Sequence, residues 1–257
     1  MNVLVFDIET VPDIETGRSL HDLGDLEDKG VAQAMFAKRR EQTGGSEFLA
    51  LHLHRIVAIS AVLRNSDNFK VWSLGSAGSN EKEIITRFFD GIERYTPTLV
   101  SWNGGGFDLP VLHYRSLLHG VAAPRYWELG DDDRDFRWNN YLNRFHFRHT
   151  DLMDVLAGYQ LRAAAPLNDI ATMLGFPGKM GMNGAAVWER YLKGEVNAIR
   201  NYCEIDVLNT YLIFLRWELL RGNLDASRWE RECEIMREHL RQANKTHLDE
   251  FLERWPN

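Results

Sequence analysis

The sequence predicts an α/β domain, and two observations carry this prediction. Short runs of apolar, often β-branched residues have the length of buried strands, and stretches with apolar residues at helical spacing follow or separate them. The 257 residues suffice for one large domain with appendages, and a hydrophobic content of 44% suits a globular core. We expect this domain to cover residues 1–220 and a C-terminal helical extension to cover residues 221–257.

The elements follow one another in a clear order. Strands are predicted at residues 2–6 with a continuation through residue 9, 54–63, 68–74, 97–102 and 146–152. Residues 64–67 predict a hairpin between the second and third strands. Helices are predicted at residues 28–42, 81–95, from 108 onward, 167–174, 184–192, 196–220 and 226–254. An insertion at residues 13–53, far longer than an ordinary connection, separates the first two strands.

Two acids continue the first strand. Asp7 and Glu9 interrupt an apolar run, and their spacing of two residues places both side chains on one face. Two adjacent like charges repel one another unless a cation lies between them, and Mg²⁺ favours carboxylate oxygens. The alternative is an exposed strand end with two solvated acids. Because the preceding run has the character of a buried strand, the sequence supports the metal interpretation about as well as the solvated one.

A third acid follows the strand at residues 97–102 and a glycine run. Asp108 stands at the start of a helix, where it could be an N-cap with Pro110 near the favoured N-terminal position. The junction of a strand and a helix is also where α/β sheets place their ligands. The glycines after Asn103 would let a substrate backbone approach closely.

A fourth acid lies within a long helical pattern. Tyr202 and Asp206 are four residues apart and share one face of the helix. A phenol one turn from a carboxylate can position a water molecule, although a core tyrosine bonded to a neighbouring acid is the commoner arrangement. Because buried carboxylates are costly unless paired or bound to metal, the four acids together suggest divalent cations and phosphodiester hydrolysis.

The three segments resemble the three motifs of the DEDD superfamily of 3′–5′ exonucleases, which has a ribonuclease H-like fold. One branch has histidine five residues before the last aspartate, where this chain has Asn201; the other has tyrosine four residues before it, as Tyr202 stands before Asp206. The chain is therefore similar to the tyrosine (DEDDy) branch. Residues 149–154, 167–184 and 202–211 further resemble a stand-alone bacterial group of predicted exonucleases related to the exonuclease domain of family B DNA polymerases.

This resemblance spans about residues 1–220 and implies a mixed five-stranded sheet, one strand antiparallel, flanked by helices. It implies two metal ions, Mg²⁺ or Mn²⁺, one held by Asp7, Glu9 and Asp206 and a second shared by Asp7 and Asp108. Tyr202 would orient the attacking water. All five residues are expected to be catalytic. Paired cations of this kind clamp the attacking and leaving oxygens of an in-line displacement.

The expected substrate is single-stranded DNA with a free 3′ end, released as 5′-mononucleotides. An exoribonuclease similar to ribonuclease D is the main alternative, and a catalytically idle nucleic-acid-binding module is another. We expect nucleic-acid contacts from residues beside the motifs and from a glycine-rich loop at 175–184: Thr10, Trp102, Asn103, Phe107 and Lys179. Residues 38–40 (Lys-Arg-Arg) are either a solvated helix end or part of a flap that contacts the nucleic acid.

Composition bounds the remaining possibilities. The net charge of −7 argues against tight, purely electrostatic DNA binding, but not against a nuclease whose metals offset its own carboxylates. Two cysteines give no disulfide framework, and no apolar run reaches membrane-spanning length. We therefore expect a cytoplasmic protein without a membrane segment.

Overall fold

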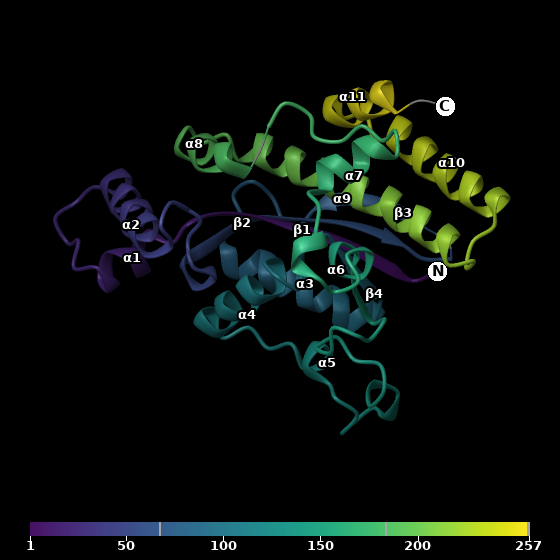
Figure 1. The fold of residues 1–257 in the computed structure, drawn as a ribbon, viewed down its shortest axis with the longest axis horizontal. Helices are drawn as coiled ribbons and strands as arrows, with labels where there is room; N and C mark the ends of the chain where they lie inside the picture. Colours follow the sequence, from purple (N-terminus) through teal and green to yellow (C-terminus); the bar gives the residue numbers. More distant parts are fainter. Residues whose placement is uncertain (67, 183, 256–257) are drawn as a thin grey trace.

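A five-stranded mixed sheet organises the chain in the computed structural model, which describes residues 1–66, 68–182 and 184–255 (Figure 1). In spatial order the strands are β3 (Phe69–Ser73), β2 (His54–Arg64), β1 (Val3–Pro12), β4 (Thr98–Ser101) and β5 (His149–Asp151). β1 is parallel to β4 and antiparallel to β2, and β2 is antiparallel to β3. β2 thus runs against the other four strands, as predicted.

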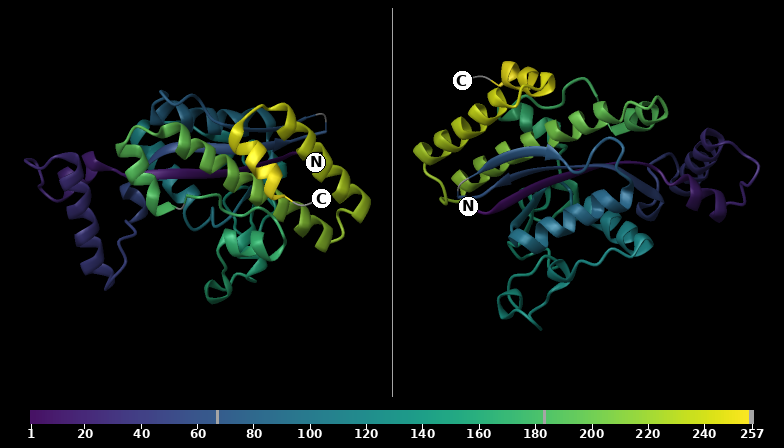
Figure 2. Two further views of the ribbon diagram at one scale, coloured as in Figure 1. Left: turned by 90° about the horizontal axis from the view of Figure 1, so that it is seen from above. Right: turned by 180° about the vertical axis from the view of Figure 1, so that it is seen from behind.

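Helices cover both faces of this sheet (Figures 1 and 2). One face carries α7 (Leu167–Met173), α8 (Val187–Leu192), α9 (Val196–Leu220), α10 (Ala226–Gln242) and α11 (Thr246–Arg254). The other carries α3 (Glu81–Tyr95), α4 (Asp108–His119) and α5 (Pro124–Trp127), and α6 (Leu152–Leu156) follows β5. The insertion forms α1 (Ile14–Leu20) and α2 (Asp28–Thr43), which project beyond the end of β1.

The alternation of side chains along β1 explains its central place. Val3 and Val5 pack in the apolar cluster that contains α9, whereas Leu4, Phe6 and Ile8 pack in the cluster that contains α3 and α4. A strand buried on both faces needs apolar residues at every position, and residues 3–6 supply them. β1 therefore holds the two helical layers together.

The bounds of α3 were predicted correctly from the sequence because its N-terminal cap and its apolar spacing indicate the same helix. Asn80 caps the helix by accepting a hydrogen bond from the backbone N–H of Glu83 at 2.9 Å. The apolar residues predicted at helical spacing form its buried face: Ile84, Ile85, Phe88, Phe89 and Ile92.

Other boundaries were predicted wrongly. Residues 226–254 form two helices instead of one, and Asn244 between them has a left-handed φ of 49°, which ends the first helix. β5 spans three residues where seven were expected, and β1 extends to Pro12. The predicted hairpin at residues 64–67 joins β2 to β3, with the Asn65 N–H donating to Asn68 O at 3.0 Å; Asp67 itself lies outside the described residues.

The C-terminal helices share the core of the sheet. Met236 and Leu240 of α10 and Leu248 and Phe251 of α11 belong to the apolar cluster that contains Val5 of β1. Among the described residues, no helix combines the length and the hydropathy needed to span a bilayer.

Candidate active site

Two acids continue the row of β1 side chains that faces α9. Val3 and Val5 begin this row, and Asp7 and Glu9 extend it because side chains alternate between the faces of a strand. Glu9 is buried and Asp7 is half-buried. The apolar layer between β1 and α9 therefore ends at Val5, and two carboxylates follow it along the strand.

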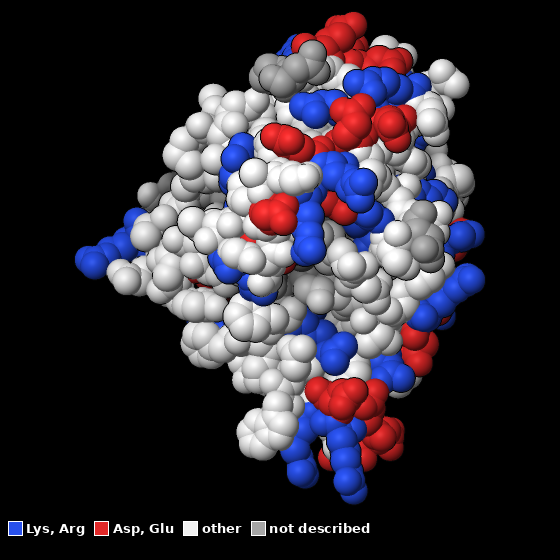
Figure 3. Space-filling view, turned by 90° about the vertical axis from the view of Figure 1, so that its right-hand side faces the viewer, with Lys and Arg blue, Asp and Glu red and all other residues white. Residues whose placement is uncertain are grey.

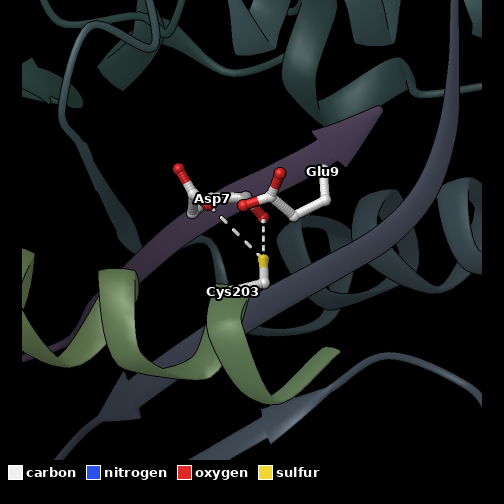
Figure 4. Close-up of side chains that lie close together, drawn as sticks. All are labelled: Asp7, Glu9 and Cys203. Carbon is white, nitrogen blue, oxygen red and sulfur yellow. Dashed lines mark hydrogen bonds between the residues drawn. The ribbon is translucent and has the colours of Figure 1, made fainter. Parts of the chain in front are cut away.

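Cys203 of α9 lies directly against these acids (Figure 4). Its thiol donates to the backbone carbonyl oxygen of Asp7 at 3.4 Å and to Asp7 Oδ2 at 3.5 Å. One potential ligand atom from each of Asp7, Glu9 and Cys203 lies within 4.8 Å of the other two. This contact joins a helix from late in the chain to the strand that begins it.

Asp108 is the first residue of α4, and its side chain contacts β1. Its Oδ1 accepts a hydrogen bond from the backbone N–H of Ile8 at 3.1 Å. Phe107 occupies the N-cap position, so the N-cap interpretation of Asp108 is wrong. Because β4 pairs with β1 only from Val3 to Val5, Asp108 meets β1 beyond the end of that pairing.

The turn before Asp108 is held by Asp151 at the end of β5. The backbone N–H groups of Asn103 and Gly105 donate to the two carboxylate oxygens of Asp151, each at 2.9 Å. Asp151 also accepts from the N–H of Met153 at the start of α6, at 3.1 Å. One carboxylate thus fixes the loop that carries Asp108.

The close packing of this turn favours glycine at residues 104 and 106. A Cβ on Gly104 would lie 2.2 Å from Ser101 Oγ, and one on Gly106 would lie 2.5 Å from Asn103 Oδ1. Asn103 has a left-handed φ of 62°. Close approach of a substrate backbone, the reason expected from the sequence, stays a prediction.

Tyr202 and Asp206 share one face of α9, as their spacing predicts. Burial and then the charge of Asp206 raise the pKa of the Tyr202 phenol, and both side chains are buried. Within the described part of the chain, Asp206 Oδ1 has no hydrogen-bond partner. A buried carboxylate oxygen without a partner is costly, so this oxygen is an acceptor that a ligand could satisfy.

The four carboxylates share one electrostatic environment. Burial first, and then the charges of Asp108, Glu9 and Asp206, raise the pKa of Asp7 well above its ordinary value. Burial and the charges of Asp206 and Asp108 do the same to the pKa of Glu9. Burial also raises the pKa of Asp108 to about 7 and that of Asp206 to about 6. The structure thus brings together all four acids that the sequence singled out.

Lys179 is a cation beside this cluster. Its charge lowers the pKa of both Glu9 and Asp206, and its Nζ lies 5.6 Å from the centre of the Tyr202 ring. Asn209, less than one turn after Asp206, holds the loop through two hydrogen bonds of 3.0 Å to the backbone of residue 178. The loop at 175–184, whose residue 183 lies outside the described residues, is therefore anchored to α9.

The remaining candidates lie around the acids in different ways. Thr10 Oγ1 is 2.8 Å from His54 Nδ1, and the ring of Phe107 packs edge-on against His54 with centroids 5.1 Å apart. Trp102 is only partly buried and packs against the α9 side of the core; its Nε1 has no hydrogen-bond partner in the described residues. Thr10 and Phe107 thus lie together, whereas Trp102 belongs to the core.

Two residues of the site were not assigned to it from the sequence. Cys203 is adjacent to Tyr202 on α9, so a strand packed beneath the helix can meet both side chains. Asp151 ends a strand at the same sheet edge as the turn before Asp108. Its position at the end of a strand marks it as a candidate site residue. Its role, however, depends on the parallel strand β4 beside it, and the sequence alone does not identify that pairing.

One sequence comparison bears on the whole arrangement. A family model described as predicted 3′–5′ exonucleases related to the exonuclease domain of PolB matches residues 46–255. The matched range contains Asp108, Tyr202 and Asp206, and β1 adds Asp7 and Glu9 from outside it. No curated protein matches the chain. Since the match covers most of the chain and the sheet has the predicted topology, the protein belongs to this family of predicted 3′–5′ exonucleases and is a hydrolase.

Proposed function

We propose that this protein is a metal-dependent 3′–5′ exonuclease of the tyrosine branch, which removes 5′-mononucleotides from the 3′ end of single-stranded DNA. The observation that carries the proposal is the convergence of four carboxylates from β1, α4 and α9. Their raised pKa values mean that their charges lack full compensation within the protein.

The donor set fits hard divalent cations. Four carboxylates supply oxygen ligands of the kind that Mg²⁺ and Mn²⁺ prefer, and Asp206 Oδ1 is a buried acceptor with no partner among the described residues. Asp7, Glu9 and Asp206 would hold one cation, and Asp7 and Asp108 would hold a second. Bound there, the two cations would supply a water nucleophile at neutral pH and stabilise the oxygens of the displaced phosphodiester.

The other residues position the reacting groups. Tyr202 would orient the attacking water through its hydroxyl. Burial and the neighbouring charges of Asp206, Glu9 and Asp7 raise the pKa of this phenol, so it stays neutral and does not act as a general base. Lys179, beside Glu9 and Asp206, would contact the phosphate that is cleaved.

The proposal is tested with oligonucleotides labelled at either end. We expect 3′-labelled single-stranded DNA to lose its label as a mononucleotide in Mg²⁺ or Mn²⁺, 5′-labelled DNA to shorten stepwise, and EDTA to stop both reactions. Circular single-stranded DNA should resist. Cleavage of the circle would mean an endonuclease, and faster loss of RNA than of DNA would favour the ribonuclease D-like alternative.

Asp7→Asn separates catalysis from binding. Because Asp7 would contact both cations, its loss should reduce turnover by at least about 100-fold, since even the outer partners of metal ligands typically contribute 10–100-fold. Binding of single-stranded DNA should persist. Glu250→Gln, an exposed carboxylate on α11, is the matched control. Wild-type turnover in Asp7→Asn, or DNA binding by the native protein without turnover in either metal, would contradict the proposal.

A further inference from the structure

An exposed phenylalanine lies at the end of the insertion between β1 and β2. Phe48 is 56% exposed, although its neighbour Leu49 is buried in an apolar cluster with Val31 and Met35 of α2. Its ring packs against two others, with centroid distances of 5.5 Å to Phe107 and 5.1 Å to His54.

These three rings form an aromatic cluster attached to the catalytic acids. Phe107 directly precedes Asp108 in the chain. His54 is bonded to Thr10, which directly follows Glu9. The Phe48–His54–Phe107 cluster is therefore connected to both β1 and α4. On each element the connection lies one residue from a candidate metal ligand, and Phe48 is the exposed member of the cluster.

The insertion holds Phe48 in place from several sides. Arg39 Nε donates to the carbonyl oxygen of Phe48 at 2.8 Å, and the Phe48 N–H donates to Ser46 Oγ at 3.2 Å. Arg40 forms an ion pair with Glu47, the preceding residue. Two cations of the basic run at residues 38–40 thus fix the segment that carries the exposed ring.

We infer that Phe48 stacks on the nucleobase at the 3′ end of the substrate, with the aromatic cluster as the wall on which that base rests. This inference rests on the proposed function, because it requires a nucleic-acid end beside Asp108 and Glu9. An aromatic face accepts any base, since every base has a π-face, and stacking is typically worth about 1–3 kcal/mol per base. The insertion thereby acquires a role in holding the unpaired terminus.

Binding without turnover tests the inference. In an Asp7→Asn background with Ca²⁺, single-stranded DNA carrying 2-aminopurine as its 3′-terminal base should lose fluorescence on binding. Phe48→Ala should weaken binding about 5- to 150-fold, the equivalent of that stacking free energy, and should abolish the fluorescence change. Phe48→Trp should restore both.

Leu20→Ala is the matched control, because Leu20 of α1 is 57% exposed in the same insertion. It should bind and quench like its Asp7→Asn parent, and the melting temperatures of all variants should agree. Unchanged affinity and quenching in Phe48→Ala would overturn the inference. Quenching by a native protein that hydrolyses nothing would refute the proposed exonuclease activity and leave the stacking inference standing.

Discussion

At the scale of single residues, Tyr202 shows how one helical turn combines packing with chemistry. Its ring is buried, burial and the charge of Asp206 raise the pKa of its hydroxyl, and the charge of Lys179 lies over its face. A core tyrosine bonded to a neighbouring acid would look much the same. Kinetic measurements on a variant without the hydroxyl therefore decide between the two roles.

Tyr202→Phe should lower kcat by roughly 10- to 1,000-fold, because a group that only orients water should contribute less than the 10²–10⁴-fold typical of proton-transfer groups. Metal affinity and melting temperature should change little, since no carboxylate is altered. The shape of the pH–rate profile should also be kept, because the phenol stays neutral. Measured side by side, an unchanged kcat would reduce Tyr202 to a packing residue.

Asp108 predicts how the metal-free protein responds to pH. Its pKa is about 7 in the folded protein and near 3.8 when unfolded, so the folded state binds more protons between these values. The contribution of Asp108 to stability in EDTA should therefore fall as pH rises from about 4 to about 7 and stay level above.

Asp108→Asn removes this contribution. In EDTA, the melting temperature of the variant should rise relative to that of the native protein between pH 5 and pH 8. The reason is that the uncharged amide can still accept a hydrogen bond from the Ile8 N–H. A constant difference between the two proteins across that range would contradict the assignment.

At the scale of elements, the sequence predicted what local signals determine and missed what distant partners determine. α3 has a cap and an amphipathic pattern of its own, and both its ends were predicted correctly. β5 was expected at more than twice its length because apolar residues near 147 look like strand residues, yet β4 offers pairing only for His149–Asp151.

The site divides in the same way. The carboxylates of β1, α4 and α9 could be predicted because each departs from the pattern of its own element. The contact of Phe48 with Phe107 could not be predicted, because the insertion has no periodicity that connects the two residues. Nor could the thiol of Cys203, whose contact with Asp7 spans 196 positions in sequence.

Glu204 couples α9 to the C-terminal helices. Its buried carboxylate accepts from the Ser73 N–H of β3 at 2.9 Å, from Lys245 at 3.0 Å and from His247 Nε2 at 2.8 Å. Burial alone would raise its pKa, but the hydrogen bonds from His247 and Lys245 and their charges lower it to about 2.

Glu204→Gln should therefore destabilise the protein by about 1.5–3 kcal/mol, the usual range for hydrogen bonds to a charged group. A depressed pKa stabilises the fold above the unfolded value, near 4.5, and this contribution is lost as pH falls toward 2. Urea unfolding at pH 7 measures the effect against Glu250→Gln. Equal urea midpoints for the two variants would show that the contacts of Glu204 contribute nothing to the free energy of unfolding.

At the scale of the whole molecule, the distribution of charge bears on how a polyanion would be attracted. The face in Figure 3 shows Lys and Arg side chains alternating with Asp and Glu, with no broad surface of one sign. With a net charge of −7, the protein has little long-range attraction for a polyanion. Under the proposed function, recognition would depend on stacking, on bound cations and on few phosphate contacts.

Affinity for single-stranded DNA should accordingly depend weakly on salt. Each phosphate contact changes log K by about 0.7 per decade of salt for single strands, so one to three contacts give a slope of about −0.7 to −2. Fluorescence titrations at several KCl concentrations measure it. A slope steeper than about −4 would reveal a basic surface that the charge distribution does not suggest.

The pairing of β1 with α9 has a consequence for synthesis on the ribosome. Asp206 follows Asp7 by 199 positions, and the partners of Glu204, which are Lys245 and His247, follow still later. Since chains fold as they leave the exit tunnel, a nascent chain that has released β1 lacks the complete set of carboxylates until α9 has also emerged. Any activity that requires all four acids must therefore wait for the synthesis of α9.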